Sequence, residues 1–162
     1  MNKQEIYDLL NRSGVTFEAV EHKAVCNMAQ LSEIEMPWPE AEAKNLFVRD
    51  DKKQRYILIT VKGEKRVDLK AFRHAHQMRP LSFATAEELM DKLGLIPGAV
   101  TPLGALNDQE GAVQAFIDRE LSEEQGLVAV HPNDNTATVL LKTDDLIRVL
   151  RENGHTVETT EL

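Results

Sequence analysis

The stretch KNLFVRD, residues 44–50, decides the fold, because an apolar run begins directly after a lysine and ends in a charged turn. The turn spans residues 50–53, and a second apolar run continues from Arg55 to Val61. Two such runs around a short polar turn predict a β-hairpin over residues 45–61. The hairpin places the cation of Lys44 at the start of a strand, where a rigid scaffold can direct it toward a ligand.

The remaining pattern predicts a mixture of helices and strands without regular βαβ alternation. It favours one α+β domain over residues 1–162, with a mixed, mostly antiparallel sheet flanked by helices, and residues 158–162 as a loose tail. The expected helices cover residues 2–13, 28–36, 70–77, a segment from the cap Thr85 to Leu93, and 144–152 after the cap Thr143. The expected strands cover residues 15–20, 66–69, 112–118, 127–130 and 136–141.

The length and composition of the chain limit the classes of protein to which it can belong. At 162 residues the chain is long enough to bury a core. It has no apolar run of about 18 residues and no signal peptide, which argues against a membrane protein. Cys26 is the single cysteine, so an intrachain disulfide is excluded and a reducing cytoplasm is the expected location.

Charge is distributed unevenly along the chain. The net charge of −8 by itself argues against a nucleic-acid-binding protein. Residues 62–79, however, hold six lysines and arginines against two acidic residues. This basic window fits brief contact with a polyanion, and it equally fits a solvated charged surface.

Residues 95–104, LIPGAVTPLG, contain two prolines and two glycines and predict a rigid, irregular loop. Glycine permits close approach to the backbone, and proline fixes the path of the chain. Backbone N–H groups aimed at one point can hold a carbonyl oxygen or a water. A plain tight connection is the alternative interpretation.

Residues 130–138, VHPNDNTAT, predict a polar turn between two strands and place His131 at a strand end. A histidine there is structural, exposed or catalytic, and the residues alone do not decide between these roles. Asn135 and Thr136 are expected to hold the turn through side-chain hydrogen bonds to the backbone.

Other chemistries find little support. His74 and His76 are the only close histidine pair, and residues two apart on a helix do not face each other, so we expect no metal site. Cys26 has no evident base beside it and is expected to be a small buried thiol. No serine-nucleophile elbow, P-loop or dinucleotide fingerprint is present.

Taken together, these segments resemble the YbaK/ProRS-associated-domain family, which includes free-standing prolyl-tRNA editing proteins. Lys44 before its strand, the GxxxP pattern of Gly98 and Pro102, and the His-Pro-x-x-Asn-Thr pattern of residues 131–136 occur in the family order. The chain departs from the family at residues 26–28, Cys-Asn-Met, where a threonine-bearing stretch is expected.

The resemblance implies the editing-domain fold and hydrolysis of the ester between a wrongly attached amino acid and tRNA, with alanine on tRNA for proline as the expected substrate. It implies no cofactor and no metal. The expected partners are the mischarged tRNA and, as a candidate, prolyl-tRNA synthetase. The implied catalytic residues are Lys44, Gly98, Pro102 and His131. Pocket lining ranks above proton transfer for His131. The implied substrate-binding and tRNA-binding residues are Asn45, Thr101, Asn135, Thr136, Lys65, Arg66, Lys70 and Arg73.

Two alternatives remain open on the sequence. One is deacylation of tRNA charged with serine, threonine or cysteine, which pocket volume would discriminate. The other is a non-catalytic module that binds tRNA or a synthetase, which would keep the basic surface but be indifferent to loss of Lys44.

Overall fold

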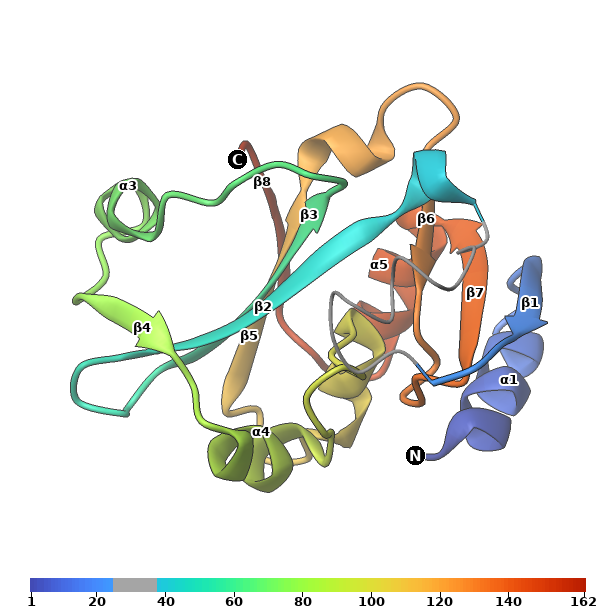
Figure 1. Ribbon diagram of the computed structural model, residues 1–162, viewed down its shortest axis with the longest axis horizontal. Helices are drawn as coiled ribbons and strands as arrows, with labels where there is room; N and C mark the ends of the chain where they lie inside the picture. Colours follow the sequence, from blue (N-terminus) through green and yellow to red (C-terminus); the bar gives the residue numbers. More distant parts are fainter. Residues whose placement is uncertain (25–37) are drawn as a thin grey trace.

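A computed structural model describes residues 1–24 and 38–162 of the chain. The helix expected at residues 28–36 and the thiol of Cys26 lie outside the described residues. The described part contains two β-sheets with helices packed against them, which confirms the α+β class (Figure 1).

The larger sheet has five strands in the order β4-β2-β3-β5-β8. Its centre is the predicted hairpin, in which β2 and β3 pair antiparallel, and β5 and β8 add to it in parallel. In chain order the strands are β2 (Ala43–Asp50), β3 (Tyr56–Lys62), β4 (Leu81–Phe83), β5 (Val113–Asp118) and β8 (Val157–Thr160).

The smaller sheet has three antiparallel strands in the order β1-β7-β6. They are β1 (Phe17–Glu21), β6 (Leu127–Val130) and β7 (Ala137–Lys142). The two sheets touch at a parallel bridge between Glu42 and Ala129. In Figure 1, β2 runs across the molecule from this junction at one end to β4 at the other.

Helices cover the sheets and are bounded by local sequence signals. They are α1 (Lys3–Arg12), α3 (Leu69–Ala75), α4 (Ala86–Leu93) and α5 (Thr143–Glu152), with 3₁₀ turns η1 (Pro39–Ala41), η2 (Pro102–Asn107) and η3 (Arg119–Ser122). The predicted capping box of Thr85 and Glu88 begins α4, and Gly94 ends it with a left-handed φ of 65°. None of the helices among the described residues is long and apolar enough to span a membrane.

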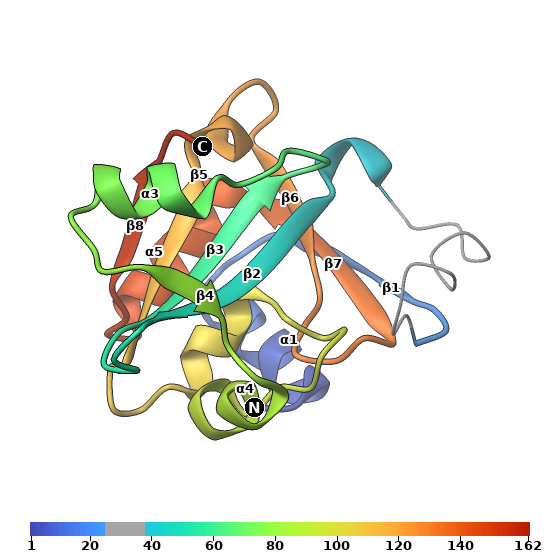
Figure 2. The same cartoon turned by 60° about the vertical axis from the view of Figure 1, so that its left-hand side comes forward.

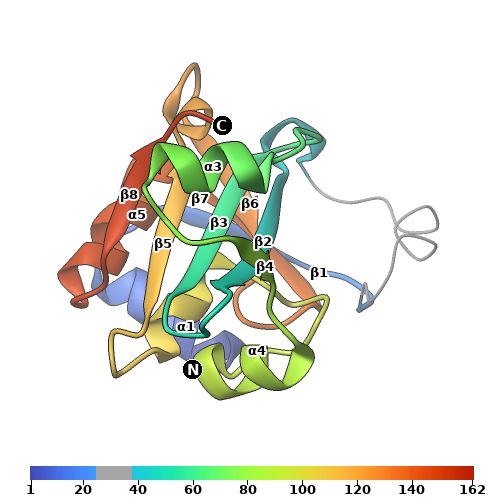
Figure 3. The same ribbon diagram turned by 90° about the vertical axis from the view of Figure 1, so that its left-hand side faces the viewer.

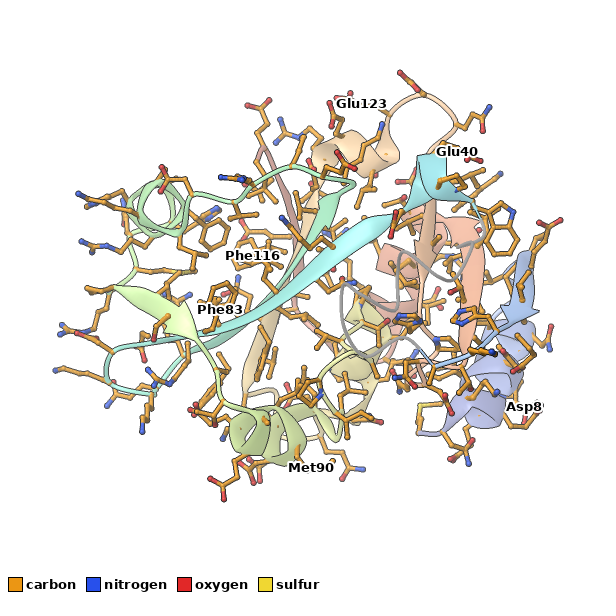
Figure 4. The ribbon with its side chains drawn as sticks, in the orientation of Figure 1. Asp8, Glu40, Phe83, Met90, Phe116 and Glu123 are labelled. Atoms are coloured by element: carbon orange, nitrogen blue, oxygen red, sulfur yellow. The ribbon has the colours of Figure 1, made fainter. Side chains whose placement is uncertain are left out.

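Alternation along β2 sends its side chains to two separate cores. Phe47 packs with Leu58 and the α4 residues Leu89 and Leu93 on one face of the sheet. Val48, on the opposite face, packs with Phe72 of α3 and other apolar groups. Figure 2 shows α3 and α4 on the two sides of the sheet. Phe116, which is labelled in Figure 4, belongs to the same core as Val48. A third and larger core joins the two sheets to α1 and α5.

Three expectations about the elements are wrong. Residues 66–69 form no strand, because Asp68 instead begins α3 by accepting hydrogen bonds from the amides of Lys70 and Ala71. Thr143 does not cap α5; its buried hydroxyl donates to the carbonyl of Leu121. The tail after residue 157 is not loose, because β8 pairs with β5.

Candidate active site

The candidate site begins at the junction of the two sheets. Lys44 and His131 each lie two residues beyond the Glu42–Ala129 bridge, one on β2 and the other directly after β6. Paired residues of neighbouring strands project to the same side, and so do residues two apart. Val128 and Val130 point into the large core, so Ala129 and His131 face away from it. The side chains of Lys44 and His131 therefore start on one common side.

Lys44 is half-buried and opposes the buried Val61 across the hairpin. Among residues 1–24 and 38–162, no carboxylate lies within ion-pair distance of its ammonium group. A half-buried cation without an anionic partner is available for an anionic group of a substrate. Its neighbour Asn45 points to the other face, where its Oδ1 accepts a hydrogen bond of 2.7 Å from the buried Thr60 hydroxyl.

His131 is fixed by its Nδ1, which lies 2.8 Å from the carbonyl oxygen of Ala137. A carbonyl only accepts, so Nδ1 carries the proton and the neutral ring keeps Nε2 as an acceptor. Burial lowers the pKa of His131 below 6.5, and the neighbouring His22 lowers it further. The ring is therefore neutral at pH 7.

His22 is a second histidine of the site. Its ring centroid lies 6.1 Å from that of His131, and its Nε2 lies 2.8 Å from Oγ1 of the buried Thr138. Thr138 stands opposite His131 in the continued register of β6 and β7. Sequence reasoning missed His22, because its contact with Thr138 joins residues 116 positions apart in the chain.

The turn that carries His131 is held from two sides. Oδ1 of Asp134 accepts hydrogen bonds from the amide and the hydroxyl of Thr136, at 2.9 and 2.5 Å. Lys3 of α1 donates to the same hydroxyl at 3.2 Å. The side-chain-to-backbone bond of the turn is therefore made by Asp134 and not by Thr136, whose hydroxyl instead donates to the Asp134 carboxylate; Asn135 is buried beside them.

The Gly98–Pro102 loop supplies unpaired backbone donors. Gly98 adopts a φ of 91°, which favours glycine, and the Thr101 hydroxyl accepts from the amide of Leu103. The amides of Gly98, Val100 and Thr101 donate to no acceptor in the described part of the chain. In Figures 1 to 3 the connection from α4 to η2, which contains this loop, extends toward the β6–β7 turn. Donors without acceptors can hold the oxygen of a substrate carbonyl.

The basic residues assigned to RNA do not form one group. Lys65 lies 3.0 Å from the buried carboxylate of Asp118 and 2.9 Å from that of Glu120, so its charge is neutralised within the fold. Arg66 is exposed, and Lys70 and Arg73 line a cleft beside α3. No group of three or more His, Cys, Asp or Glu side chains among the described residues could hold a metal ion.

The unpaired lysine, the neutral histidine and the free amides are the groups of this candidate site, and their chemistry suits hydrolysis of an activated ester. A sequence model of the aminoacyl-tRNA editing domain family matches residues 22–149. The chain belongs to this family. Editing removes an amino acid from tRNA by hydrolysis of an ester, so the chain is an aminoacyl-tRNA deacylase.

Named relatives cover nearly the whole chain. The chain is 34% identical over 160 residues to the prolyl-tRNA editing protein ProX of Acetoanaerobium sticklandii, covering 99% of this chain and 97% of that protein. It is 30% identical over 155 residues to the prolyl-tRNA synthetase associated domain-containing protein 1 of Danio rerio, covering 95% and 84%.

Solved structures share the fold. One was described as a candidate trans-editing enzyme for prolyl tRNA synthetase; it superimposes with a TM-score of 0.67 at 23% identity, over 99% of this chain and 96% of that one. At this level of identity the likeness concerns the fold alone.

Proposed function

We propose that this protein hydrolyses the ester between alanine and a tRNA for proline, in trans to the synthetase that made the error. The proposal is supported by the relatives named for prolyl-tRNA editing, and by one structural observation that carries the chemistry. That observation is a set of groups without partners among the described residues: the ammonium of Lys44 and the amides of Gly98, Val100 and Thr101.

The physical need for such an enzyme follows from the size of proline. A pocket built for proline cannot strongly exclude the smaller alanine, because the lost apolar contact is worth only about 1–3 kcal/mol. A second site that admits alanine and rejects proline removes the wrong product. We assign His131 to the wall of that second pocket, because it is neutral and anchored by Ala137.

The reaction needs positioned groups rather than a covalent intermediate. A water adds to the ester carbonyl, negative charge develops on the carbonyl oxygen, and the bond to the ribose oxygen breaks as that oxygen gains a proton. In this proposal the free amides of the Gly98–Pro102 loop hold the developing oxyanion. Lys44 holds the phosphate or ribose of the terminal adenosine, or shares the charge of the oxyanion.

Deacylation assays test the proposal directly. Wild type, Lys44→Ala and the control Lys142→Ala, an exposed lysine at the end of β7, would be compared on Ala-tRNA(Pro), Pro-tRNA(Pro), Ser-tRNA and Cys-tRNA. We expect alanine-selective hydrolysis that falls about 10²–10³-fold in Lys44→Ala and is unchanged in the control. Faster release of serine or cysteine would contradict the alanine specificity. Binding of tRNA without any hydrolysis would favour the non-catalytic module.

A further inference from the structure

A small cleft lies between α3 and β4, at the end of β2 opposite to the candidate active site. It has a volume of about 270 Å³ and is lined by Leu69, Lys70, Arg73, Pro80 and Leu81. The lining thus combines three apolar residues with two cations. Arg73 is held in place by a hydrogen bond of 3.3 Å from its Nη1 to the carbonyl oxygen of Met78.

The acidic residues nearest in sequence do not neutralise these cations. Asp68 is occupied by the amides at the start of α3, and Asp51 pairs with Arg79 at 2.6 Å. Within the described ranges of the chain, neither Lys70 nor Arg73 has a carboxylate within ion-pair distance. On a protein of net charge −8, this cleft is therefore a local positive site suited to phosphate groups.

An exposed aromatic ring stands next to the cleft on the same side of the sheet. Phe83 is 62% exposed, the most exposed of the large apolar side chains among the described residues. It pairs with Val48 in the β2–β4 register, and Leu81 of the cleft, two residues earlier on β4, shares its face. Figure 4 shows Phe83 on β4, separate from the other exposed apolar side chain it labels, Met90 on α4. A solvent-facing ring beside unpaired cations is the arrangement on which nucleic-acid bases stack.

The spacing of these features matches a short single strand of RNA. Phe83 and Leu81 lie beside Val48 and Asp50, which are four and six residues along β2 from Lys44. At about 3.3 Å per residue the separation is about 13–20 Å. A stacked strand advances about 3.4 Å per nucleotide, so roughly four to six nucleotides cover this distance. Lys44 and Phe83 both project from the face of the sheet that carries Leu46 and Val48, so the two ends of the path lie on one side of the sheet.

We propose that Phe83 and the α3–β4 cleft form a second RNA-binding surface, on which the unpaired 3′ strand of the tRNA stacks and its backbone phosphates meet Lys70 and Arg73 as the strand leaves the active site. This surface rests on the proposed function, because it assumes that the terminal adenosine lies at Lys44. This surface binds and positions the tRNA strand and takes no part in the hydrolysis of the ester. Lys65, although basic, is not part of it, because its charge is neutralised by Asp118 and Glu120.

The test separates RNA binding from ester hydrolysis. The variants are Phe83→Ala and Lys70→Glu, and the matched controls are Met90→Ala, an apolar side chain 51% exposed on α4, and Lys142→Glu. Affinity for uncharged tRNA(Pro) would be measured by fluorescence anisotropy at several salt concentrations. Hydrolysis would be measured on alanyl-adenosine, which is too short to reach the cleft.

We expect Phe83→Ala and Lys70→Glu each to weaken tRNA binding about fivefold or more, while both controls bind as the wild type does. Lys70→Glu should also reduce the slope of log affinity against log salt by about 1. Hydrolysis of alanyl-adenosine should be equal in all five proteins. Unchanged affinity in Phe83→Ala and Lys70→Glu overturns this proposal. Failure of the wild type to cleave either alanyl-adenosine or Ala-tRNA(Pro), with tRNA binding still dependent on Phe83, overturns the proposed function instead and leaves the surface in place.

Discussion

Two lysines lie near the same end of the hairpin and have opposite surroundings. Lys65 lies between the carboxylates of Asp118 and Glu120, and it also donates to the carbonyl of Leu162 at 3.3 Å. Lys44 lies at the start of β2 without a carboxylate within ion-pair distance among the described residues. The sequence presents Lys65 as part of the basic window of residues 62–79 and Lys44 as a lone cation before a strand. The structure makes one a support of the fold and leaves the other available to a ligand.

A second fully paired cluster repeats this contrast. Glu88 accepts hydrogen bonds from the amide of Thr85, from the hydroxyl of Tyr56 and from Arg49. The Thr85 amide, followed by Tyr56 and Arg49, lowers the pKa of Glu88 from 4.5 to about 2. By contrast, the groups around Lys44, Gly98 and His131 keep donors and acceptors unused. In this protein, therefore, fully paired polar groups support the fold, and polar groups without partners mark the candidate site.

The largest effect should come from breaking the paired region. Asp118→Ala removes a carboxylate that is 1% exposed, leaves the amides of Lys62 and Glu120 without their acceptor, and takes away one of the two carboxylates paired with Lys65. We expect a loss of about 3–5 kcal/mol in the free energy of unfolding, measured by urea denaturation. Glu161→Ala, which breaks the exposed pair with Arg119, should cost less than about 1 kcal/mol. Once corrected for its folded fraction, Asp118→Ala should keep far more deacylase activity than Lys44→Ala. Equal losses of activity in the two variants would contradict the distinction between the paired region and the unpaired region.

A smaller effect, on activity, should come from the unpaired region. Gly98→Ala places a side chain at a φ of 91°, so the loop must shift and the positions of its free amides change. We expect kcat/KM for the mischarged tRNA to fall about 10–100-fold. Gly154→Ala is the matched control, because its φ is 88° and a Cβ there meets no atom within 4 Å. The free energy of unfolding should fall by a similar amount in both variants. Equal deacylase activity in both would show that the loop is not part of the site.

The smallest effect should appear in the pH dependence of stability, which differs between the two regions. The pKa of His131 is below 6.5, so its neutral form contributes stability that is complete above pH 6.5 and is lost as the pH falls through the folded-state pKa. The pKa of Glu88 is about 2, so its contribution is complete above pH 4.5 and is lost between pH 4.5 and 2. Thermal melts at a series of pH values would compare the wild type with His131→Asn and Glu88→Gln. His131→Asn should flatten the dependence only in the upper window and Glu88→Gln only in the lower one. A reversed pattern would refute both assignments.

Features with local causes were predicted well. The hairpin of β2 and β3 follows from alternating apolar residues around a charged turn, and the capping box of Thr85 and Glu88 follows from residues three apart. Both depend on contacts between neighbours in the chain, so the sequence contains the whole signal.

Features with distant causes were missed. Strand β8 contains one buried apolar residue, Val157, and is stabilised by pairing with β5, about forty residues away in the chain. The local sequence predicts Thr143 as a helix cap, yet its hydroxyl donates a hydrogen bond to the carbonyl of Leu121 instead. The basic window predicts Lys65 as an RNA contact, yet a carboxylate 53 residues away neutralises its charge. In each case a long-range partner overrides the local preference.

The sequence by itself determined the mixed α+β class, the hairpin, the glycine-containing loop at residues 98–102 and the histidine-bearing turn, because each depends on the chemistry of adjacent residues. The tertiary structure alone decided which charges are free. It brought Lys44 and His131 to the same side of one bridge, partly buried His131, which favours its neutral form, and paired Lys65 with Asp118. The reason is physical: the charge state and availability of a side chain depend on its neighbours in space, and those are set by the packing of segments far apart in the chain.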